Sequence, residues 1–297
     1  MDMNQQGRLA VVTGANSGLG LVTATELARR GAHVVLAVRD TAAGERVAAA
    51  IRQETPTAQV EARELDLASL ASVRRFAAEL PHPAIDLLIN NAGLVVLGRR
   101  RTTADGFELQ LGTNMLGHFA LTGLLLDRLG RAAAPRVVSL SSITHKGQRL
   151  DFDDLMSLRD FSANRAYGRS KLATTAYGLE LDRRLRAAGS PIVSVVAHPG
   201  MTRTNLSFRA FAHWGPIGRV PVLLTRWVLP PASQGALPQL YAATAPEVRG
   251  GQFFGPSGPF EIRGRVVEVR PSAEAADPAV GRRLWAAAEE LTGVSYL

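Results

Sequence analysis

Short apolar runs alternate with longer helical patterns along most of this chain. Five runs are nearly continuous in Val, Ile and Leu, which is typical of strands buried on both faces of a parallel sheet. The run at 59–66 instead alternates apolar and polar residues, so we expect it nearer an edge. The runs are LAVVTG (9–14), HVVLAVR (33–39), QVEARELD (59–66), IDLLINNAG (85–93), RVVSLSS (136–142) and IVSVVAHPG (192–200).

Strands that alternate with helices form βαβ units, and right-handed crossovers place helices on both faces of the sheet. The sequence therefore predicts an α/β fold with a single-domain, Rossmann-type doubly wound parallel sheet over residues 1–297. We expect the first helix to end at Gly31, Ser233 to cap a later helix, and Asp277 with Pro278 to begin the last one.

Residues 201–231 break this rhythm and are rich in Phe, Trp, Pro and Gly. A long irregular apolar insert is often an active-site lid. We expect either a helical substrate lid or a peripheral helical pair packed on the core. The aromatic residues Phe208, Phe211, Trp214 and Trp227 predict a fairly large apolar substrate.

The composition excludes several classes of protein. The chain has no Cys, which excludes disulfides, thiolate metal sites and a Cys nucleophile. Its six His show no metal-ligand spacing, so we expect no metal. No signal peptide or long apolar run is present, so we expect a cytoplasmic protein without a membrane span. The net charge of +8 comes from Arg interleaved with Asp and Glu, which favours a solvated surface over nucleic-acid binding.

A glycine-rich loop, TGANSGLG at 13–20, follows the first predicted strand and opens the first predicted helix. Gly14 allows a tight turn, while Gly18 and Gly20 would let the backbone approach a pyrophosphate at the helix N-terminus. With a strand before it and a helix after it, the loop indicates dinucleotide binding, with a purely structural turn as the alternative.

The second predicted strand ends in LAVRD at 36–40. An acidic residue here would bind the ribose of NAD, whereas an arginine accommodates the 2′-phosphate of NADP. Val38 occupies the position of the acid and Arg39 follows it, which predicts NADP(H). In the alternative, Asp40 binds the ribose and the cofactor is NAD(H).

The pentapeptide YGRSK places Tyr167 four residues before Lys171. On a helix the two side chains share one face, so the ammonium is expected to lower the pKa of the phenol. The alternative is an exposed helical pair.

These motifs, together with NNAG (90–93), Asn114 in GTNMLGHF, Ser142 in VVSLSS and HPGMTRT (198–204), occur in the order found in short-chain dehydrogenases/reductases. The chain resembles this family over nearly its whole length. VRDTAAGE (38–45), SSITHKGQRLDFDDL (141–155) and YGRSKLA (167–173) are similar to the subgroup of retinol dehydrogenases, WW-domain oxidoreductases and protochlorophyllide reductases. Unlike the vertebrate retinol enzymes, the chain is expected to have no N-terminal membrane anchor.

The resemblance implies a catalytic role for four residues. Tyr167 would be the general acid/base, and Lys171 would lower its pKa and reach ribose hydroxyls. Ser142, rather than its neighbour Ser141, would hydrogen-bond the substrate oxygen. Asn114 would hold a water that links Lys171 to solvent, with a helix kink or packing role as the alternative.

The resemblance also implies the cofactor contacts. Asn90 would contact the adenosine ribose or serve a structural role at the strand end, and Thr204 would reach the carboxamide. Asp66 and Leu67 would meet the adenine ring, and His198 is expected to be structural. The full set is Gly14, Asn16, Ser17, Gly18, Leu19, Gly20, Arg39, Asp66, Leu67, Asn90, Ala92, Gly93, Tyr167, Lys171, Pro199, Gly200 and Thr204.

The expected function is hydride transfer between NADP(H) and a carbonyl or alcohol group of a fairly large apolar substrate. The substrate would contact Ser142, Tyr167, Phe208, Phe211 and Trp214. The alternatives are reduction of a carbon–carbon double bond and a non-catalytic NADP-binding regulator. The resemblance implies a homodimer or homotetramer built on the helices near 105–130 and 162–188, although monomers occur in the subgroup.

Overall fold

A computed structural model describes residues 4–202 and 230–297 of the chain. Its sheet has eight strands in the order β3-β2-β1-β4-β5-β6-β7-β8, and only the last pair is antiparallel. The strands are β1 (Leu9–Thr13), β2 (His33–Val38), β3 (Val60–Glu64), β4 (Leu87–Asn90), β5 (Arg136–Leu140), β6 (Val193–Ala197), β7 (Phe253–Pro256) and β8 (Val266–Glu268).

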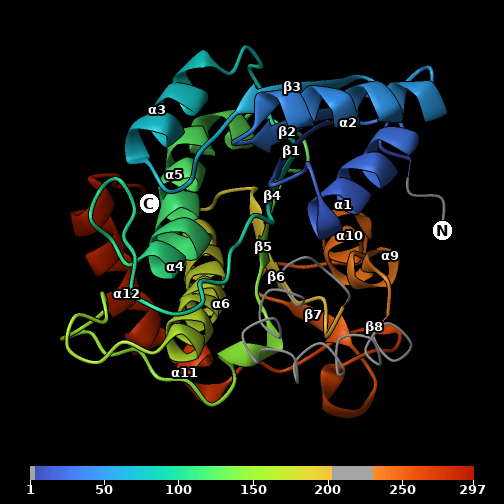
Figure 1. The fold of residues 1–297 in the computed structure, drawn as a ribbon. Coiled ribbons are helices and arrows are strands. Elements are labelled where there is room, and N and C mark those ends of the chain that lie inside the picture. The colour runs from blue at the N-terminus through green and yellow to red at the C-terminus, as the bar shows by residue number, and fades with distance from the viewer. Residues whose placement is uncertain (1–3, 203–229) are drawn as a thin grey trace, which may run out of the picture.

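Helices cover both faces of the sheet, as Figure 1 shows. One face carries α1 (Gly18–Arg29), α2 (Thr41–Glu54), α9 (Ala232–Gly235) and α10 (Leu237–Thr244). The other carries α3 (Leu70–Glu79), α4 (Leu109–Leu111), η1 (Gly112–Leu116), α5 (Gly117–Gly130), α6 (Ala163–Ala187), α11 (Ala273–Ala276) and α12 (Pro278–Thr292). Two short 3₁₀ turns, η2 (Ile143–His145) and η3 (Pro259–Glu261), lie in connecting segments.

The central strands are buried on both faces, which confirms the doubly wound sheet. Successive side chains of a strand point to opposite faces. In β1, Val11 packs into the cluster beneath α5 and α6, while Ala10 and Val12 pack into the cluster beneath α1 and α10. All six predicted strands are present, and β3 lies at an edge as expected.

The predicted and the observed elements differ only locally. β7 and β8 were not predicted from the sequence, because they have only four and three residues. Gly31 adopts a positive φ of 92° after α1, and Asp277 caps α12 as predicted. The Ser233 prediction is wrong, because Ser233 lies inside the four-residue α9. The predicted lid at 201–231 falls almost entirely outside the described residues, as do Thr204, Phe208, Phe211, Trp214 and Trp227.

Candidate functional site

The candidate site lies where the carboxyl ends of β1, β4, β5 and β6 meet at one edge of the sheet. The chain winds outward from β1 to β3 and then returns to the other side of β1 at β4. Such a reversal opens a crevice beyond the strand ends, where doubly wound folds bind ligands.

The glycine loop joins β1 to α1 in the conformation that its sequence predicts. Gly14 and Gly18 have φ values of 65° and 56°, which residues with a Cβ rarely adopt. The N-cap residue Ser17 is exposed and makes no side-chain bond to the helix. Asn16 is half-buried, and Leu19 packs against the core beneath α1.

Gly20 has a packing role in this structure. A Cβ on Gly20 would lie 2.4 Å from the carbonyl oxygen of Gly14 and 2.4 Å from Nδ2 of Asn91. The missing side chain therefore lets α1 pack closely against the loop and the end of β4.

Thr13 and Asn91, which no sequence motif singled out, fix the loop to the end of β4. The Thr13 hydroxyl accepts the backbone N–H groups of Asn91, at 3.0 Å, and Ala92, at 2.9 Å. The Asn91 side chain donates to the Thr13 carbonyl at 2.7 Å. Gln239 of α10 donates to Oδ1 of Asn91 at 3.3 Å, so a helix remote in sequence also supports the loop.

The position of Asn90 favours a structural role at the end of β4. Its side chain is 2% exposed and donates to Oγ1 of Thr122 in α5 at 3.1 Å. The side chain therefore points into the core, which favours the structural role. Ala92 is half-buried and Gly93 is exposed at the mouth of the site.

The residues expected at the adenosine end lie beyond β2 and β3. Arg39 is exposed, whereas Oδ1 of Asp40 accepts the backbone N–H of Ala43 at 2.9 Å and caps α2. Asp66 accepts the N–H of Ala68 at 2.9 Å. The side chain of Leu67 is buried in the core.

Ser142, Tyr167 and Lys171 come together from β5 and α6. Ser142 is half-buried just after β5 and hydrogen-bonds the Tyr167 side chain. Nζ of Lys171 donates to the carbonyl of Leu140 at 2.8 Å and lies 6.0 Å from the Tyr167 ring centroid. Ser141 is fully enclosed instead, since its hydroxyl bonds the carbonyl of Lys171 at 3.0 Å.

The pKa of Tyr167 differs from the prediction. Burial raises the pKa of Tyr167, and the hydrogen bond from Ser142 offsets only part of the rise. The predicted lowering by Lys171 is wrong for this structure, because the ammonium is directed at Leu140 rather than at the phenol. Burial lowers the pKa of Lys171 to about 8, so the lysine still carries its proton at neutral pH.

Asn114 lies in η1, a π-helical turn, and its side chain fixes the segment after β4. It accepts the N–H of Leu94 at 2.8 Å and donates to the carbonyl of Leu94 at 3.1 Å and to Ser170 at 2.9 Å. Its own carbonyl accepts from His118 at 3.0 Å. A Cβ on Gly93 would lie 3.2 Å from Nζ of Lys171 and 3.4 Å from Oδ1 of Asn114. Asn114 therefore lies beside Lys171. It also lies at an irregular turn of the helix, as the alternative of a helix kink predicted.

His198 and Glu261 support the far wall of the site. His198 is fully buried beyond β6, and its Nε2 lies 2.9 Å from Oε2 of Glu261. Burial lowers the pKa of His198 to about 4, so it is a neutral structural group, as expected. The other Glu261 oxygen binds Lys146, just after Ser142. No sequence motif pointed to Glu261, which has a φ of 55° in η3.

Pro199 and Gly200 complete this wall and are half-buried. Gly200 has a φ of 68°, and a Cβ there would lie 2.4 Å from the carbonyl of Ile262. The turn after β6 is therefore held against the segment around Glu261.

Comparisons with known proteins agree with this geometry. A family model described as short chain dehydrogenase matches residues 8–213. Human retinol dehydrogenase 13 is 42% identical over 97% of this chain and 85% of its own length. Mouse polyprenol dehydrogenase is 41% identical over the same shares. The crystal structure of an uncharacterised protein from Mycobacterium paratuberculosis has a TM-score of 0.81 and 44% identity, over 98% of this chain and 96% of that one.

A doubly wound sheet with a glycine loop at its switch point and a Ser, Tyr and Lys group beside it defines a nicotinamide-type oxidoreductase fold. The chain belongs to the short-chain dehydrogenase family. Within the family it falls in the subgroup similar to the retinol dehydrogenases and polyprenol dehydrogenase.

Proposed function

We propose that this enzyme is an NADP(H)-dependent oxidoreductase that interconverts a carbonyl and an alcohol on a large apolar substrate. The observation that carries the proposal is the contact of Ser142 with Tyr167 beside the buried Lys171, at the edge of the sheet where the glycine loop lies. The retinol and polyprenol in the names of its relatives are both long apolar alcohols, which supports the substrate class.

The residues of the crevice fit a dinucleotide. The positive φ of Gly14 and Gly18 exposes backbone near the start of α1, and no described side chain caps that helix end. Free N–H groups at a helix N-terminus bind phosphate. The residues proposed to hold the cofactor are Gly14, Asn16, Ser17, Gly18, Leu19, Arg39, Asp66, Ala92, Gly93, Tyr167, Lys171, Pro199, Gly200 and Thr204. When bound, the nicotinamide supplies or accepts the hydride.

Arg39 and Asp40 favour NADP(H) over NAD(H). The carboxylate of Asp40 is already engaged as the cap of α2, so it is poorly placed to bind a ribose hydroxyl. The exposed guanidinium of Arg39 makes no hydrogen bond or ion pair within residues 4–202 and 230–297, which leaves it available for a 2′-phosphate.

Tyr167 is proposed to exchange the proton with the substrate oxygen. Because burial raises its pKa, the phenol keeps its proton at neutral pH and can donate it to a carbonyl oxygen. Ser142 would donate a hydrogen bond to the same oxygen as negative charge develops on it. Removal of a proton from an alcohol needs the phenolate, and the hydrogen bond from Ser142 favours that form.

The test is turnover by the wild type and Tyr167→Phe with NADPH and a panel of bulky aldehydes and ketones, including retinal and a polyprenal. We expect the variant to lose at least a hundredfold in kcat, since general acid catalysis contributes about 10²–10⁴-fold. NADPH should bind the variant nearly as well as the wild type, and more tightly than NADH binds either. Near-wild-type turnover by the variant would refute the role of Tyr167, and tighter NADH binding would refute the cofactor assignment.

A further inference from the structure

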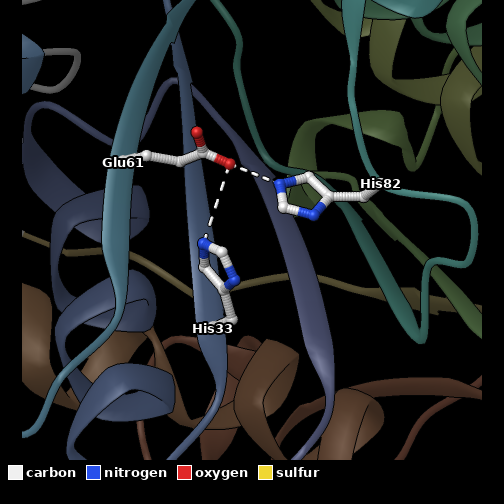
Figure 2. A group of neighbouring side chains, drawn as sticks. All are labelled: His33, Glu61 and His82. Carbon is white, nitrogen blue, oxygen red and sulfur yellow. Dashed lines mark hydrogen bonds and ion pairs between the residues drawn. The ribbon is translucent and has the colours of Figure 1, made fainter.

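Two histidines and a glutamate meet at the edge of the sheet opposite the candidate active site (Figure 2). His33 is the first residue of β2, and Arg39 follows the last. At about 3.3 Å per residue, this separates the group from the crevice by about 20 Å. The catalytic proposal uses none of the three residues.

The three donor atoms face one another. Nε2 of His82 lies 2.5 Å from Oε1 of Glu61, and Nε2 of His33 lies 3.7 Å from the same oxygen. All three atoms lie within 4.8 Å of one another. The side chains are 21–30% exposed, so an ion from solvent can reach them.

The fold builds this arrangement from three separate elements. In the parallel pairing of β2 and β3, Val35 lies opposite Glu61. His33 is two residues before Val35 and shares its face, so it is a diagonal neighbour of Glu61. His82 lies in the segment between α3 and β4, flanked by Pro81 and Pro83, which restrict its backbone.

Neighbouring charges leave one oxygen of Glu61 for this group. Arg63 donates to Oε2 through Nε at 3.1 Å and Nη2 at 2.8 Å, so Oε1 alone faces the two imidazoles. Burial works to raise the pKa of Glu61, but hydrogen bonds from His82 and Arg63 outweigh it and the pKa is lowered. Burial and repulsion from His82 lower the pKa of His33, which favours the neutral imidazole that binds metals.

Hydrogen bonds within the protein hold the side chains of Glu61 and His82 in place, but not that of His33. The His82–Glu61 contact satisfies both partners, whereas His33 has no hydrogen bond to its ring in the described part of the chain and is beyond bonding distance of Glu61. A Zn²⁺ ion with bonds of about 2.0–2.1 Å would need donor atoms about 3.3 Å apart in tetrahedral geometry. The two spacings to Oε1 of Glu61, 2.5 Å and 3.7 Å, lie on either side of this value.

We propose that His33, Glu61 and His82 form a Zn²⁺ site, with water in the remaining position. Two imidazoles and one carboxylate are a donor set that suits Zn²⁺ and not the oxygen-seeking Mg²⁺ or Ca²⁺. The ion would join the β2–β3 edge to the segment that leads into β4. It would stabilise the side of the sheet that faces away from the crevice.

The test uses tag-free full-length protein, stripped with a chelator and titrated with Zn²⁺ by calorimetry. Co²⁺ serves as a visible probe, because its absorption reports coordination by nitrogen and oxygen. We expect saturable binding of one ion per chain. His33→Gln, His82→Gln and Glu61→Gln should each weaken it at least tenfold, while Mg²⁺ should not bind.

Glu64→Gln is the matched control, since Glu64 lies on the same strand and carries the same charge but pairs with Arg75. It should bind Zn²⁺ like the wild type, and circular dichroism should show that every variant is folded. Absence of saturable Zn²⁺ binding to the wild type would overturn the proposal. Equal binding by folded His33→Gln and His82→Gln proteins would overturn it as well.

Discussion

At the scale of the residue, the two adjacent serines after β5 provide a direct comparison. The hydroxyl of Ser142 contacts Tyr167, whereas that of Ser141 bonds the carbonyl of Lys171 and Oγ1 of Thr175. We expect Ser142→Ala to lower kcat by about a hundredfold or more and leave the melting temperature unchanged. Ser141→Ala should cost about 1 kcal/mol of stability and change kcat by only a few fold. Kinetics and thermal melts of the pair check this, and equal loss of kcat in both would contradict it.

Sequence motifs located the residues whose chemistry depends on local spacing. Tyr167 and Lys171 lie one helical turn apart, and Gly14 and Gly18 follow directly from the loop. The contacts that support them were not predictable, because they join distant segments. Glu261 reaches Lys146 across 115 residues. The pKa of Tyr167 was predicted in the wrong direction, since spacing alone did not reveal that the ammonium of Lys171 is bonded to Leu140.

At the scale of the element, the close contact of α1 with the glycine loop depends on Gly20. A Cβ there would meet the backbone of Gly14 at 2.4 Å, and backbone atoms cannot move aside easily. Gly20→Ala should therefore destabilise the protein by about 1–3 kcal/mol and weaken NADPH binding at least tenfold. Gly130→Ala, at the end of α5, is the control because nothing lies within 4 Å of its added Cβ. Urea unfolding and NADPH titration test the pair; an unaffected Gly20→Ala protein would disprove the packing role.

The elements that could be predicted are those with a strong repeating pattern. Buried parallel strands contain continuous Val and Ile, so β1, β2, β4, β5 and β6 were recognised. β7 has the sequence FFGP, and Gly and Pro are uncommon in strands. The strand was therefore not predicted, and it forms through its pairing with β6. The Ser233 prediction failed because cap propensity does not specify where so short a helix begins.

At the scale of the whole molecule, the alternation of strands and helices predicted the doubly wound sheet. The clustering of His33 with Glu61 and His82 was not predictable from histidine spacing, because it depends on the register of β2 against β3. No helix in residues 4–202 or 230–297 is long and apolar enough to cross a membrane.

The buried histidines make the stability of the whole molecule depend on pH. Burial lowers the pKa of His118 and of His198 to about 4, whereas an unfolded histidine titrates near 6.5. Below about pH 6.5 the unfolded chain binds protons that the folded protein does not, so stability is fully present above that pH and is lost towards pH 4. Each histidine should lower the free energy of unfolding by about 2 kcal/mol when the pH falls to about 5.

Urea unfolding between about pH 8 and pH 5, with a chelator present to exclude metal binding near His33, measures this loss. The midpoint should be constant above neutrality and fall steadily below it. His118→Gln removes one titrating group, so its midpoint should fall less steeply even if the variant is less stable at pH 8. The ring of His118 lies between the Thr13 hydroxyl and the carbonyl of Asn114, so its protonation would turn the ring nitrogen that faces Thr13 into a donor. A wild-type midpoint that does not change down to pH 5 would show that these histidines are protonated in the folded protein.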